Sequence, residues 1–571
     1  MTTRDTMYSR DVPCGDRQCI SVLEDGVTKL APELDGSGNV EYKTKLDAVS
    51  SSRATHLATQ LQWRLAEGDG HAVYVVGVRD NGDVVGITDD EFQQTLATLE
   101  DMAQQLGNTC IESVKKRVLE TQDRRVVAEV RLAQQTSLPR TELRIAVLGE
   151  HSAGKSTILG CLAYDEADDG HGKARLSLLR HRHELESGST SSITLEMLGF
   201  SADGKLQTYA NNRSEEHIYQ RSSHIATLID TCGHTKHLKT TARALTGYSP
   251  HMFCIVIGAD SPSVTATTRE YLRIAAAFKM PLVVVVSKMD IAEKSGFAAL
   301  MHDLLATLDA VLPDRGKCMV SNTADYSALA SDTMDLGVVP IFTVSAVRTV
   351  GLSELTAVIG QARASASSHP DAPGIPADAG EFEFQIEHLY SIDSVGSVAS
   401  GWVNRGSVSI SGAAERRLVV GPQSSGEFSG VDITSIHTLR IPTETASAGL
   451  GVALAVKPHD TMTLQKGMVI LDAEQLGKGD RQVTNEFTAT VAILDPDFAK
   501  MQFVTVHIRS AYHLARVVQV NDCSSAGEAC QQATIRLKLD GDVHEYVYPG
   551  IPLVARDGRS FTFAGHIAAT L

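Results

Sequence analysis

The strongest constraint on the fold of this 571-residue chain is a Gly-rich segment set between a strand pattern and a helix pattern. The apolar run LRIAVLG ends on Gly149, and TILGCLA, with apolar residues at helical spacing, follows Ser156. A GxxxxGKS loop in this setting turns successive backbone N–H groups toward a phosphate at a helix N-terminus. We therefore expect a triphosphate-binding loop whose nucleotide contacts are Gly149, Glu150, His151, Ser152, Ala153, Gly154, Lys155, Ser156 and Thr157.

Two positions of this loop and a second motif predict a magnesium site. Lys155 is expected to reach the β- and γ-phosphates, and the Ser156 hydroxyl to ligate Mg²⁺. The strand pattern ATLID ends on Asp230, which opens a DxxG motif closed by Gly233. The Asp230 carboxylate would hold Mg²⁺ through water, and the Gly233 N–H would meet the γ-phosphate.

The switch threonine is expected in the Ser/Thr-rich segment 186–192. Thr190 is our candidate, because its hydroxyl would complete the Mg²⁺ shell only while the γ-phosphate is present. The alternatives to Thr190 are Ser191, Thr194 or a solvated loop without a metal ligand.

His234 directly follows the DxxG motif and is the candidate catalytic residue, placed to orient the attacking water. The alternative for His234 is a structural histidine.

The base-binding side is predicted from two later strand ends. The run PLVVVV leads into the sequence SKMD, with Ser287, Lys288 and Asp290. The Asp290 carboxylate can accept hydrogen bonds from guanine N1–H and N2–H, which adenine does not offer, so the site selects GTP over ATP. Lys288 would lie along the base, and the backbone at Ser345 and Ala346, which end PIFTV, would meet guanine O6.

The remaining patterns predict a multidomain chain. Residues 140–363 alternate apolar strands with helices, which is typical of a doubly wound α/β P-loop GTPase domain. A Pro/Ala/Ser/Gly linker spans residues 364–380, and Gly-rich short strands then predict two antiparallel β-barrels, domain II at 381–476 and domain III at 484–571. Ahead of the GTPase domain we expect a disordered tail at 1–37 and a small N-terminal α/β domain at 38–139.

The net charge, the cysteines and the apolar runs limit which binding partners and which compartment we expect. The formal charge of −17 argues against non-specific nucleic-acid coating, and we expect no DNA binding. The nine cysteines show no zinc-ligand spacing, so reduced thiols in a cytosolic protein are the simpler interpretation. No apolar run is long enough for a transmembrane helix, so we expect no membrane insertion. We also expect a monomer.

Taken in order, GExxAGKS, ESGST, DTCGH, SKMD and SA resemble the motifs of the translational GTPases, the group of elongation factor Tu, in which His follows DxxG. The segments ARLSLLRHRHELESGSTSS, TREYLRIAAAFKMPLVVVVSKMD and LQKGMVI are more specifically similar to the eukaryotic GTP-binding protein one/two family. That resemblance covers residues 38 to 571. It implies a cytosolic GTPase that uses GTP and Mg²⁺ and engages ribosomes and aminoacyl-tRNA in elongation, stalling relief or mRNA surveillance. Domain II would receive the tRNA acceptor end, and domain III would contact the tRNA stem.

Four positions depart from the pattern of the group. The P-loop Asp associated with a monovalent cation is Ser152 here, and Ser287 replaces the commoner Asn. His151 and Ser189 stand where elongation factor Tu has apolar residues beside its catalytic His. These changes leave nucleotide binding expected and put the intrinsic hydrolysis rate and its cation dependence in question.

A second class of function is a GTP-switched regulatory or trafficking adaptor that binds protein partners. Its support is the extra N-terminal domain and the acidic balance, with 15 Lys and Arg against 21 Asp and Glu from residue 381 onward. A third class, a GTPase unit that drives a metabolic enzyme as in sulfate activation, lacks a second catalytic motif in the sequence.

Overall fold

The computed structural model describes most of the chain as two compact units, 1–138 and 139–571. The described residues are 28–32, 38–46, 51–68, 70–106, 109–119, 123–134, 141–188, 190–212, 214–321, 325–363, 381–393, 395–413, 416–495, 497–498, 501–522, 531–558 and 560–570. Most of the predicted tail at 1–37, the whole predicted linker at 364–380 and Ser189 lie outside them. The four cysteines assigned as free thiols are Cys161, Cys232, Cys254 and Cys318. No described helix is both long and apolar enough to cross a membrane.

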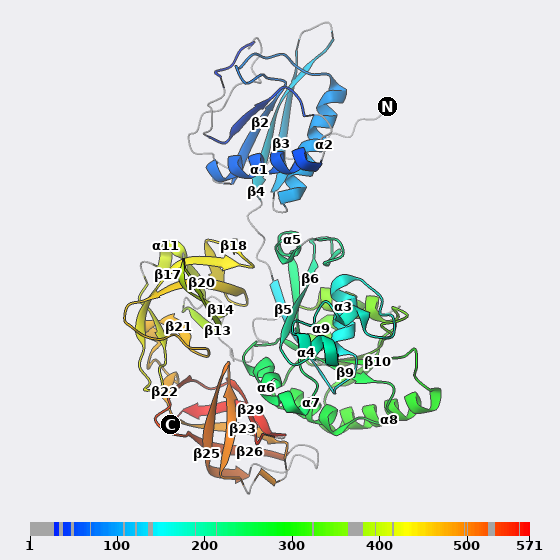
Figure 1. Ribbon diagram of the computed structural model, residues 1–571, viewed down its shortest axis with the longest axis vertical. Coiled ribbons are helices and arrows are strands. Elements are labelled where there is room, and N and C mark those ends of the chain that lie inside the picture. The colour runs from blue at the N-terminus through cyan, green and yellow to red at the C-terminus, as the bar shows by residue number, and fades with distance from the viewer. Residues whose placement is uncertain are drawn as a thin grey trace. The chain divides into compact units, whose positions relative to one another are not determined.

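The first unit is a two-layer α/β fold (Figure 1). Its sheet has the order β1-β2-β4-β3, with β1 parallel to β2 and β4 antiparallel to both of its neighbours. Apolar residues of α1 and α2 pack on one face of this sheet, for example Leu61 and Leu99 against Tyr74. The elements are β1 (Val40–Lys43), α1 (Ser51–Glu67), β2 (His71–Val76), α2 (Asp89–Leu106), β3 (Thr109–Val118) and β4 (Val126–Gln134).

The segment AVYVVGVRDNGDVVGI has the pattern of a hairpin, and past β2 the chain turns back on itself. Val78 and Val84 form an antiparallel bridge, and the Arg79 N–H donates to the Asp83 carbonyl (3.0 Å). The edge strand β3 has no counterpart in the prediction, because its sequence TCIESVKKRV lacks an uninterrupted apolar run.

The second unit begins with an eight-stranded sheet of order β11-β12-β10-β9-β5-β8-β6-β7. Strands β5, β8, β9, β10, β11 and β12 pair in parallel, whereas β6 runs antiparallel to β8. The strands are β5 (Thr141–Gly149), β6 (Thr194–Phe200), β7 (Leu206–Gln207), β8 (His224–Asp230), β9 (Met252–Gly258), β10 (Leu282–Ser287), β11 (Gly316–Met319) and β12 (Val338–Thr343).

Helices cover both faces of this sheet, as the Val/Ile/Leu-rich strands require. One apolar core joins α3, α9 and α10 to the sheet, and a separate core joins α6, α7 and α8 to it. The helices are α3 (Lys155–Tyr164), α4 (Arg182–Ser187), α5 (Glu215–Gln220), α6 (Leu238–Thr246), α7 (Ala266–Ala277), α8 (Lys294–Val311), α9 (Tyr326–Met334) and α10 (Leu352–Gln361), with short 3-10 turns η1 (Lys173–Arg175) and η2 (Thr235–His237). The predicted doubly wound α/β class is confirmed.

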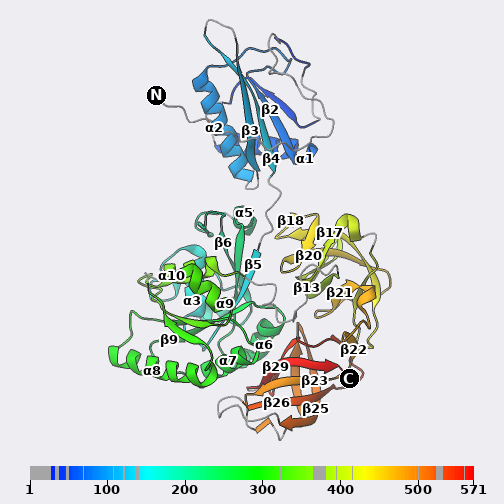
Figure 2. The same ribbon diagram turned by 180° about the vertical axis from the view of Figure 1, so that it is seen from behind.

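After residue 380 the described chain is almost entirely β (Figure 2). The first set is a sheet of order β16-β21-β13-β14-β20-β17-β18, which closes on itself because β16 also pairs with β17. Its elements are β13 (Glu383–Ile392), β14 (Gly396–Arg405), β15 (Ser407–Ser409), α11 (Ile410–Ala413), β16 (Leu418–Gly421), β17 (Ser429–Thr438), β18 (Ile441–Pro442), β19 (Thr445–Ser447), β20 (Gly451–Pro458) and β21 (Val469–Asp472), followed by η3 (Ala473–Gln475).

The second set is a closed six-stranded barrel, β23-β26-β25-β24-β28-β29. Its side chains and those of β21 share one apolar core, in which Leu471 packs with Phe487 and Val547. The elements are β22 (Gln482–Thr484), β23 (Glu486–Ile493), β24 (Phe503–Ile508), β25 (Ala511–Asp522), β26 (Gln531–Leu539), β27 (Glu545–Val547), β28 (Pro552–Arg556) and β29 (Phe561–Thr570). The predicted class, a GTPase domain followed by antiparallel β-barrels with a small α/β unit ahead of it, is therefore confirmed.

Candidate functional site: a nucleotide pocket at the strand ends

The loop between β5 and α3 takes the conformation that its glycines allow. Gly149 has φ 146°, and a Cβ on it would lie 2.3 Å from the Val256 carbonyl oxygen. Gly154, at φ 92°, is the N-cap of α3, so the helix dipole points its positive end at the loop. The Lys155 ammonium curls back to donate hydrogen bonds to the carbonyls of Gly149 (3.0 Å) and Glu150 (2.9 Å). Burial lowers the pKa of Lys155, and an anion in the loop would favour its charged form.

Three oxygen-bearing side chains meet at the start of α3. The Ser156 hydroxyl donates to Asp230 Oδ2 (2.6 Å) and lies 2.8 Å from the Thr190 hydroxyl. Asp230 is fully buried, and its Oδ1 has no hydrogen-bond partner among the described residues. Burial raises the pKa of Asp230, and the hydrogen bond from Ser156 and the charge of Lys155 oppose this rise.

This cluster fits Mg²⁺. The ion prefers hard oxygen ligands and is commonly held by one or two side chains together with substrate phosphates. No group of three His, Cys, Asp or Glu side chains suited to a metal occurs in the described part of the chain. Ser156 and Thr190 would therefore hold the ion together with the phosphates, and Asp230 would balance its charge.

The loop after β8 brings the DxxG motif onto the phosphate-binding loop. A Cβ on Gly233 would lie 2.7 Å from the Glu150 carbonyl carbon and oxygen and 2.3 Å from Lys155 Nζ, so only glycine allows this approach. His234 caps η2, and its Nδ1 accepts a hydrogen bond from the Lys236 N–H (3.1 Å). Its ring centroid lies 5.6 Å from that of His151. Burial and the neighbouring His234 lower the pKa of His151.

The other end of the site is built from the ends of β10 and β12. The Ser287 hydroxyl donates to the Ala153 carbonyl (2.6 Å), and Lys288 Nζ is paired with Asp260 Oδ2 (2.6 Å). The Ser345 hydroxyl donates to Asp290 Oδ1 (2.7 Å). This bond fixes the carboxylate plane that would face a guanine edge.

One cavity of about 400 Å³ connects the two ends. Most of the predicted contact residues line it: His151, Ser152, Gly154, Lys155, Ser156, Thr157, Thr190, Gly233, Ser287, Lys288, Asp290 and Ala346. Six predicted residues lie next to the cavity lining without forming it: Gly149, Glu150, Ala153, Asp230, His234 and Ser345. A cavity of this size and shape, cationic at the loop and acidic at Asp290, suits a nucleotide.

A second wall of the cavity has no counterpart in the sequence prediction. It is the segment after α3, where the buried Asp168 carboxylate accepts hydrogen bonds from the backbone N–H groups of Gly170 (2.9 Å), Gly172 (3.2 Å) and Ala174 (3.0 Å). Arg175 follows and also lines the cavity. The spacing of the glycines in DDGHG is the only sequence signal for this turn.

The DxxG segment is directly connected to the barrels. Helix α6 starts right after η2, and near its end Thr246 donates to the Arg509 carbonyl (2.7 Å). The next carbonyl, of Gly247, accepts a hydrogen bond from Gln385 Nε2 on β13 (2.9 Å). Arg243 of α6 is also ion-paired with the buried Glu387.

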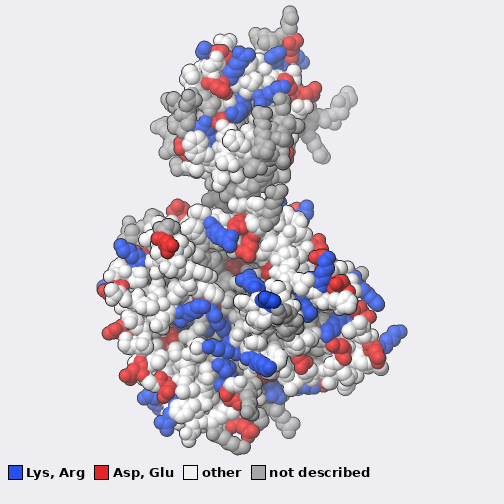
Figure 3. All heavy atoms as spheres, viewed as in Figure 1, with Lys and Arg blue, Asp and Glu red and all other residues white. Residues whose placement is uncertain are grey.

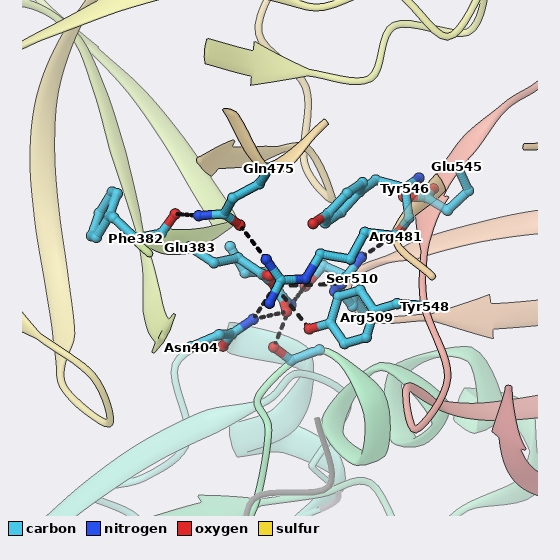
Figure 4. Close-up of polar contacts among 12 residues, drawn as sticks. Phe382, Glu383, Asn404, Gln475, Arg481, Arg509, Ser510, Glu545, Tyr546 and Tyr548 are labelled. Atoms are coloured by element: carbon cyan, nitrogen blue, oxygen red, sulfur yellow. Dashed lines mark hydrogen bonds and ion pairs between the residues drawn. The ribbon is translucent and has the colours of Figure 1, made fainter. Parts of the chain in front are cut away.

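Figure 4 shows the polar network that holds the two barrels together next to this helix. Glu383 Oε1 accepts a hydrogen bond from Tyr548 OH (3.1 Å) and lies 3.4 Å from Arg509 Nη2. Arg509 Nη1 also donates to the Tyr546 carbonyl (2.6 Å). Because Arg509 and Glu383 are almost fully buried, removing either partner would leave an uncompensated charge. The end of α6 therefore contacts residues of both barrels at this junction.

Fold and site together define a P-loop GTPase of the elongation factor Tu class. Residues 141–364 match the elongation factor Tu GTP binding domain. Over 536 residues the chain is 34% identical to human GTP-binding protein 2, covering 93% of this chain and 86% of that protein. It is 30% identical over 546 residues to GTP-binding protein 1 of Xenopus laevis, covering 93% and 79%. The chain belongs to the family of GTP-binding proteins 1 and 2, and GTP with Mg²⁺ is the ligand of its pocket.

Among solved structures, the GTP-bound GTPase-like domain of S. cerevisiae Ski7 is similar, with a TM-score of 0.54 and 14% identity. The match covers 76% of this chain and 98% of that one. At this identity the likeness shows the fold alone.

Proposed function

We propose that the protein is a GTP-hydrolysing translation factor of the elongation factor Tu type, which binds aminoacyl-tRNA and ribosomes in elongation, stalling relief or mRNA surveillance. The observation that carries the proposal is the continuous connection from the DxxG loop, which ends at Gly233 beside the phosphate-binding loop, through α6 to the two barrels. Gly233 abuts Lys155, and α6 runs from that loop to the barrel junction at Gln385. The state of the γ-phosphate can therefore set the position of the barrels.

The hydrolysis that we propose is an in-line displacement on the γ-phosphorus. A water oxygen bonds to that phosphorus, and the bond to the β–γ bridging oxygen breaks with its electron pair going to GDP. The water protons leave with the released phosphate and solvent. His234 positions the water, while Lys155 and the α3 N-terminus hold the phosphates.

Loss of the γ-phosphate would then release the switch segments. The Thr190 hydroxyl contacts Ser156 and Asp230. In this proposal the bound cation and γ-phosphate hold Thr190 in that position. Without them, Thr190 and Gly233 separate from the loop and α6 follows. The barrels then lose the geometry that presents tRNA.

The distribution of charged side chains on the surface supports an RNA partner, although the net charge of the chain is negative. On the face drawn in Figure 3, Lys and Arg side chains of the second unit gather along the middle, while Asp and Glu lie mostly toward the edges. Such a local basic strip can contact phosphates even where the net charge is −17. We place this activity in the cytosol, where ribosomes and charged tRNA are available.

The test compares His234→Ala with the wild type. The variant should bind GTP within about twofold of the wild-type affinity and lose at least about 100-fold of ribosome-stimulated hydrolysis, as expected for a water-positioning residue. His302→Ala, at an exposed position on α8, is the matched control and should behave like the wild type. Equal ribosome-stimulated turnover in wild type and His234→Ala would reject the assignment.

A second assay distinguishes the translation factor from the alternative function, a GTP-switched adaptor that binds protein partners. A translation factor of this type should protect aminoacyl-tRNA from spontaneous deacylation in GTP and not in GDP. An adaptor should give no protection in either nucleotide.

A further inference from the structure

Arg175 is a cation of the nucleotide cavity that the roles assigned above leave unused. It is the last residue of η1 (Lys173–Arg175), and its partly buried side chain lines the same cavity as Lys155 and Thr190.

Two glycines leave the space that the guanidinium occupies. A Cβ on Gly172 would lie 2.5 Å from Arg175 Nε, and a Cβ on Gly188 would lie 2.7 Å from Arg175 Nη2. Both glycines have positive φ, 92° and 64°, so other residues are strained there even before the contact is counted. Gly188 also stands two residues before Thr190. The guanidinium is thus wedged between the Asp168 turn and the switch segment.

Among the side chains and backbone groups that the structure describes, no carboxylate or carbonyl accepts a hydrogen bond from the Arg175 guanidinium. The two other cations of the cavity are already engaged, Lys155 by two carbonyls and Lys288 by Asp260. Nearby Asp168 is occupied by three backbone N–H groups.

The charge of the guanidinium lies close to the phosphate end of the cavity. Burial is the main cause that lowers the pKa of His151, a residue of the phosphate-binding loop next to His234, and the charges of His234, Lys155 and Arg175 add to it. A partly buried guanidinium held beside a phosphate loop without an acceptor is an arrangement that an anion completes.

We propose that Arg175 is a catalytic residue that donates hydrogen bonds to the γ-phosphate and the β–γ bridging oxygen of bound GTP. This rests on the proposed GTP hydrolysis. When the bridging bond breaks, its electron pair goes to the β-phosphate of GDP, and the guanidinium stabilises the negative charge that develops there. An arginine supplied from within the same chain raises hydrolysis by about 10³-fold or more in other GTPases.

Arg175→Ala tests this, with Lys173→Gln as the matched control. Lys173 belongs to the same turn but is exposed and paired with Glu166, and it does not line the nucleotide cavity. Arg175→Ala should lower single-turnover hydrolysis by at least about 100-fold and weaken binding of a non-hydrolysable GTP analogue by about tenfold or more, while GDP affinity stays within about threefold. Lys173→Gln should match the wild type in all three.

Two further readouts separate a chemical role from a structural one. Wild-type protein loaded with GDP should bind aluminium fluoride, and Arg175→Ala should not. Free guanidinium ion at millimolar concentration should restore part of the activity of Arg175→Ala and leave Lys173→Gln unchanged. Gly188→Ala, which displaces the guanidinium without removing it, should reproduce the loss of analogue affinity.

Several outcomes overturn the proposal. They are unchanged hydrolysis and analogue binding in Arg175→Ala, or equal losses of GDP and analogue affinity without guanidinium rescue. If wild-type protein itself hydrolyses no GTP with or without ribosomes, the proposed function fails. In that case the ratio of analogue to GDP affinity in Arg175→Ala still decides whether Arg175 contacts the γ-phosphate.

Discussion

The hydroxyl of Ser287, at the end of β10, donates a 2.6 Å hydrogen bond to the carbonyl of Ala153 in the phosphate-binding loop. It also reaches the Ile257 carbonyl on β9 (3.1 Å). A single buried hydroxyl thus joins the base-binding end of the pocket to its phosphate-binding end.

Removing this hydroxyl should weaken all guanine nucleotides alike. Ser287→Ala leaves the Ala153 carbonyl without its donor, at a cost of about 1–3 kcal/mol, which corresponds to about a 5- to 150-fold loss of affinity for GTP and GDP. Isothermal titration calorimetry with both nucleotides measures the change. Ser295→Ala, at an exposed position on α8, should bind both normally. A loss confined to GTP would contradict this role.

Base selection should change with Asp290. Asp290→Asn replaces an acceptor pair by one acceptor and one donor, which no longer matches guanine N1–H and N2–H but can donate to the 2-oxo group of xanthine. We expect GTP affinity to fall at least about 100-fold and xanthosine triphosphate to bind better than GTP. Competition against a fluorescent nucleotide measures both. If Asp290→Asn still preferred guanine nucleotides, Asp290 would not be the residue that contacts the base.

Communication with the barrels should depend on Gln385. Gln385→Met keeps the side-chain volume but removes the donor to the Gly247 carbonyl, so unfolding should become easier by about 1–3 kcal/mol. Hydrogen exchange at β13 should also differ less between the GDP state and the GTP-analogue state than it does in the wild type. Gln465→Met, on an exposed loop, serves as control. A full nucleotide-dependent difference in Gln385→Met would mean that the coupling runs by another route.

Acid should destabilise the closed barrel through His507. This side chain is 2% exposed, and burial lowers its pKa to about 3, helped by nearby Arg556, Lys239 and His513. Arg556 Nε donates to its neutral Nε2 (3.1 Å), so protonation would break this bond. The unfolded histidine has a pKa near 6.5.

Because the folded pKa is the lower one, the stability from neutral His507 is present above about pH 6.5 and is lost as pH falls toward 3. Between pH 7 and pH 5 the loss should be about 2 kcal/mol. In His507→Gln the free energy of unfolding should be less pH-dependent by about that amount, as measured by urea unfolding at several pH values. The same slope in both proteins would show that folding does not lower the pKa of His507.

The strands of the GTPase domain and the residues at their ends are predictable from the sequence, because uninterrupted apolar runs mark them. The apolar runs ending at Gly149, Asp230 and Ser287 specify parallel strands, and parallel strands bring their carboxyl ends to one edge of the sheet. The meeting of Ser156 with Asp230, 74 residues apart, follows from that topology alone.

Other features of the site and the barrels depend on contacts between distant residues, which the spacing of apolar residues along the sequence does not reveal. Arg175 lies in a short 3-10 turn, and its place in the pocket is set by Gly172 and Gly188, one before it and one after. The barrel junction pairs Glu383 with Arg509, 126 residues apart, and the register of antiparallel strands that brings them together cannot be read from alternation. The strand β3 is missed for a related reason, because an edge strand exposed on one side carries too few apolar residues.

The most direct test of the account is the nucleotide preference of the purified chain in magnesium. Asp290 beside Ser345, together with the loop around Lys155, predicts that GTP and GDP bind at least about 100-fold more tightly than ATP and ADP. Equal affinity for guanine and adenine nucleotides would contradict the assignment of the pocket and the switch mechanism built on it.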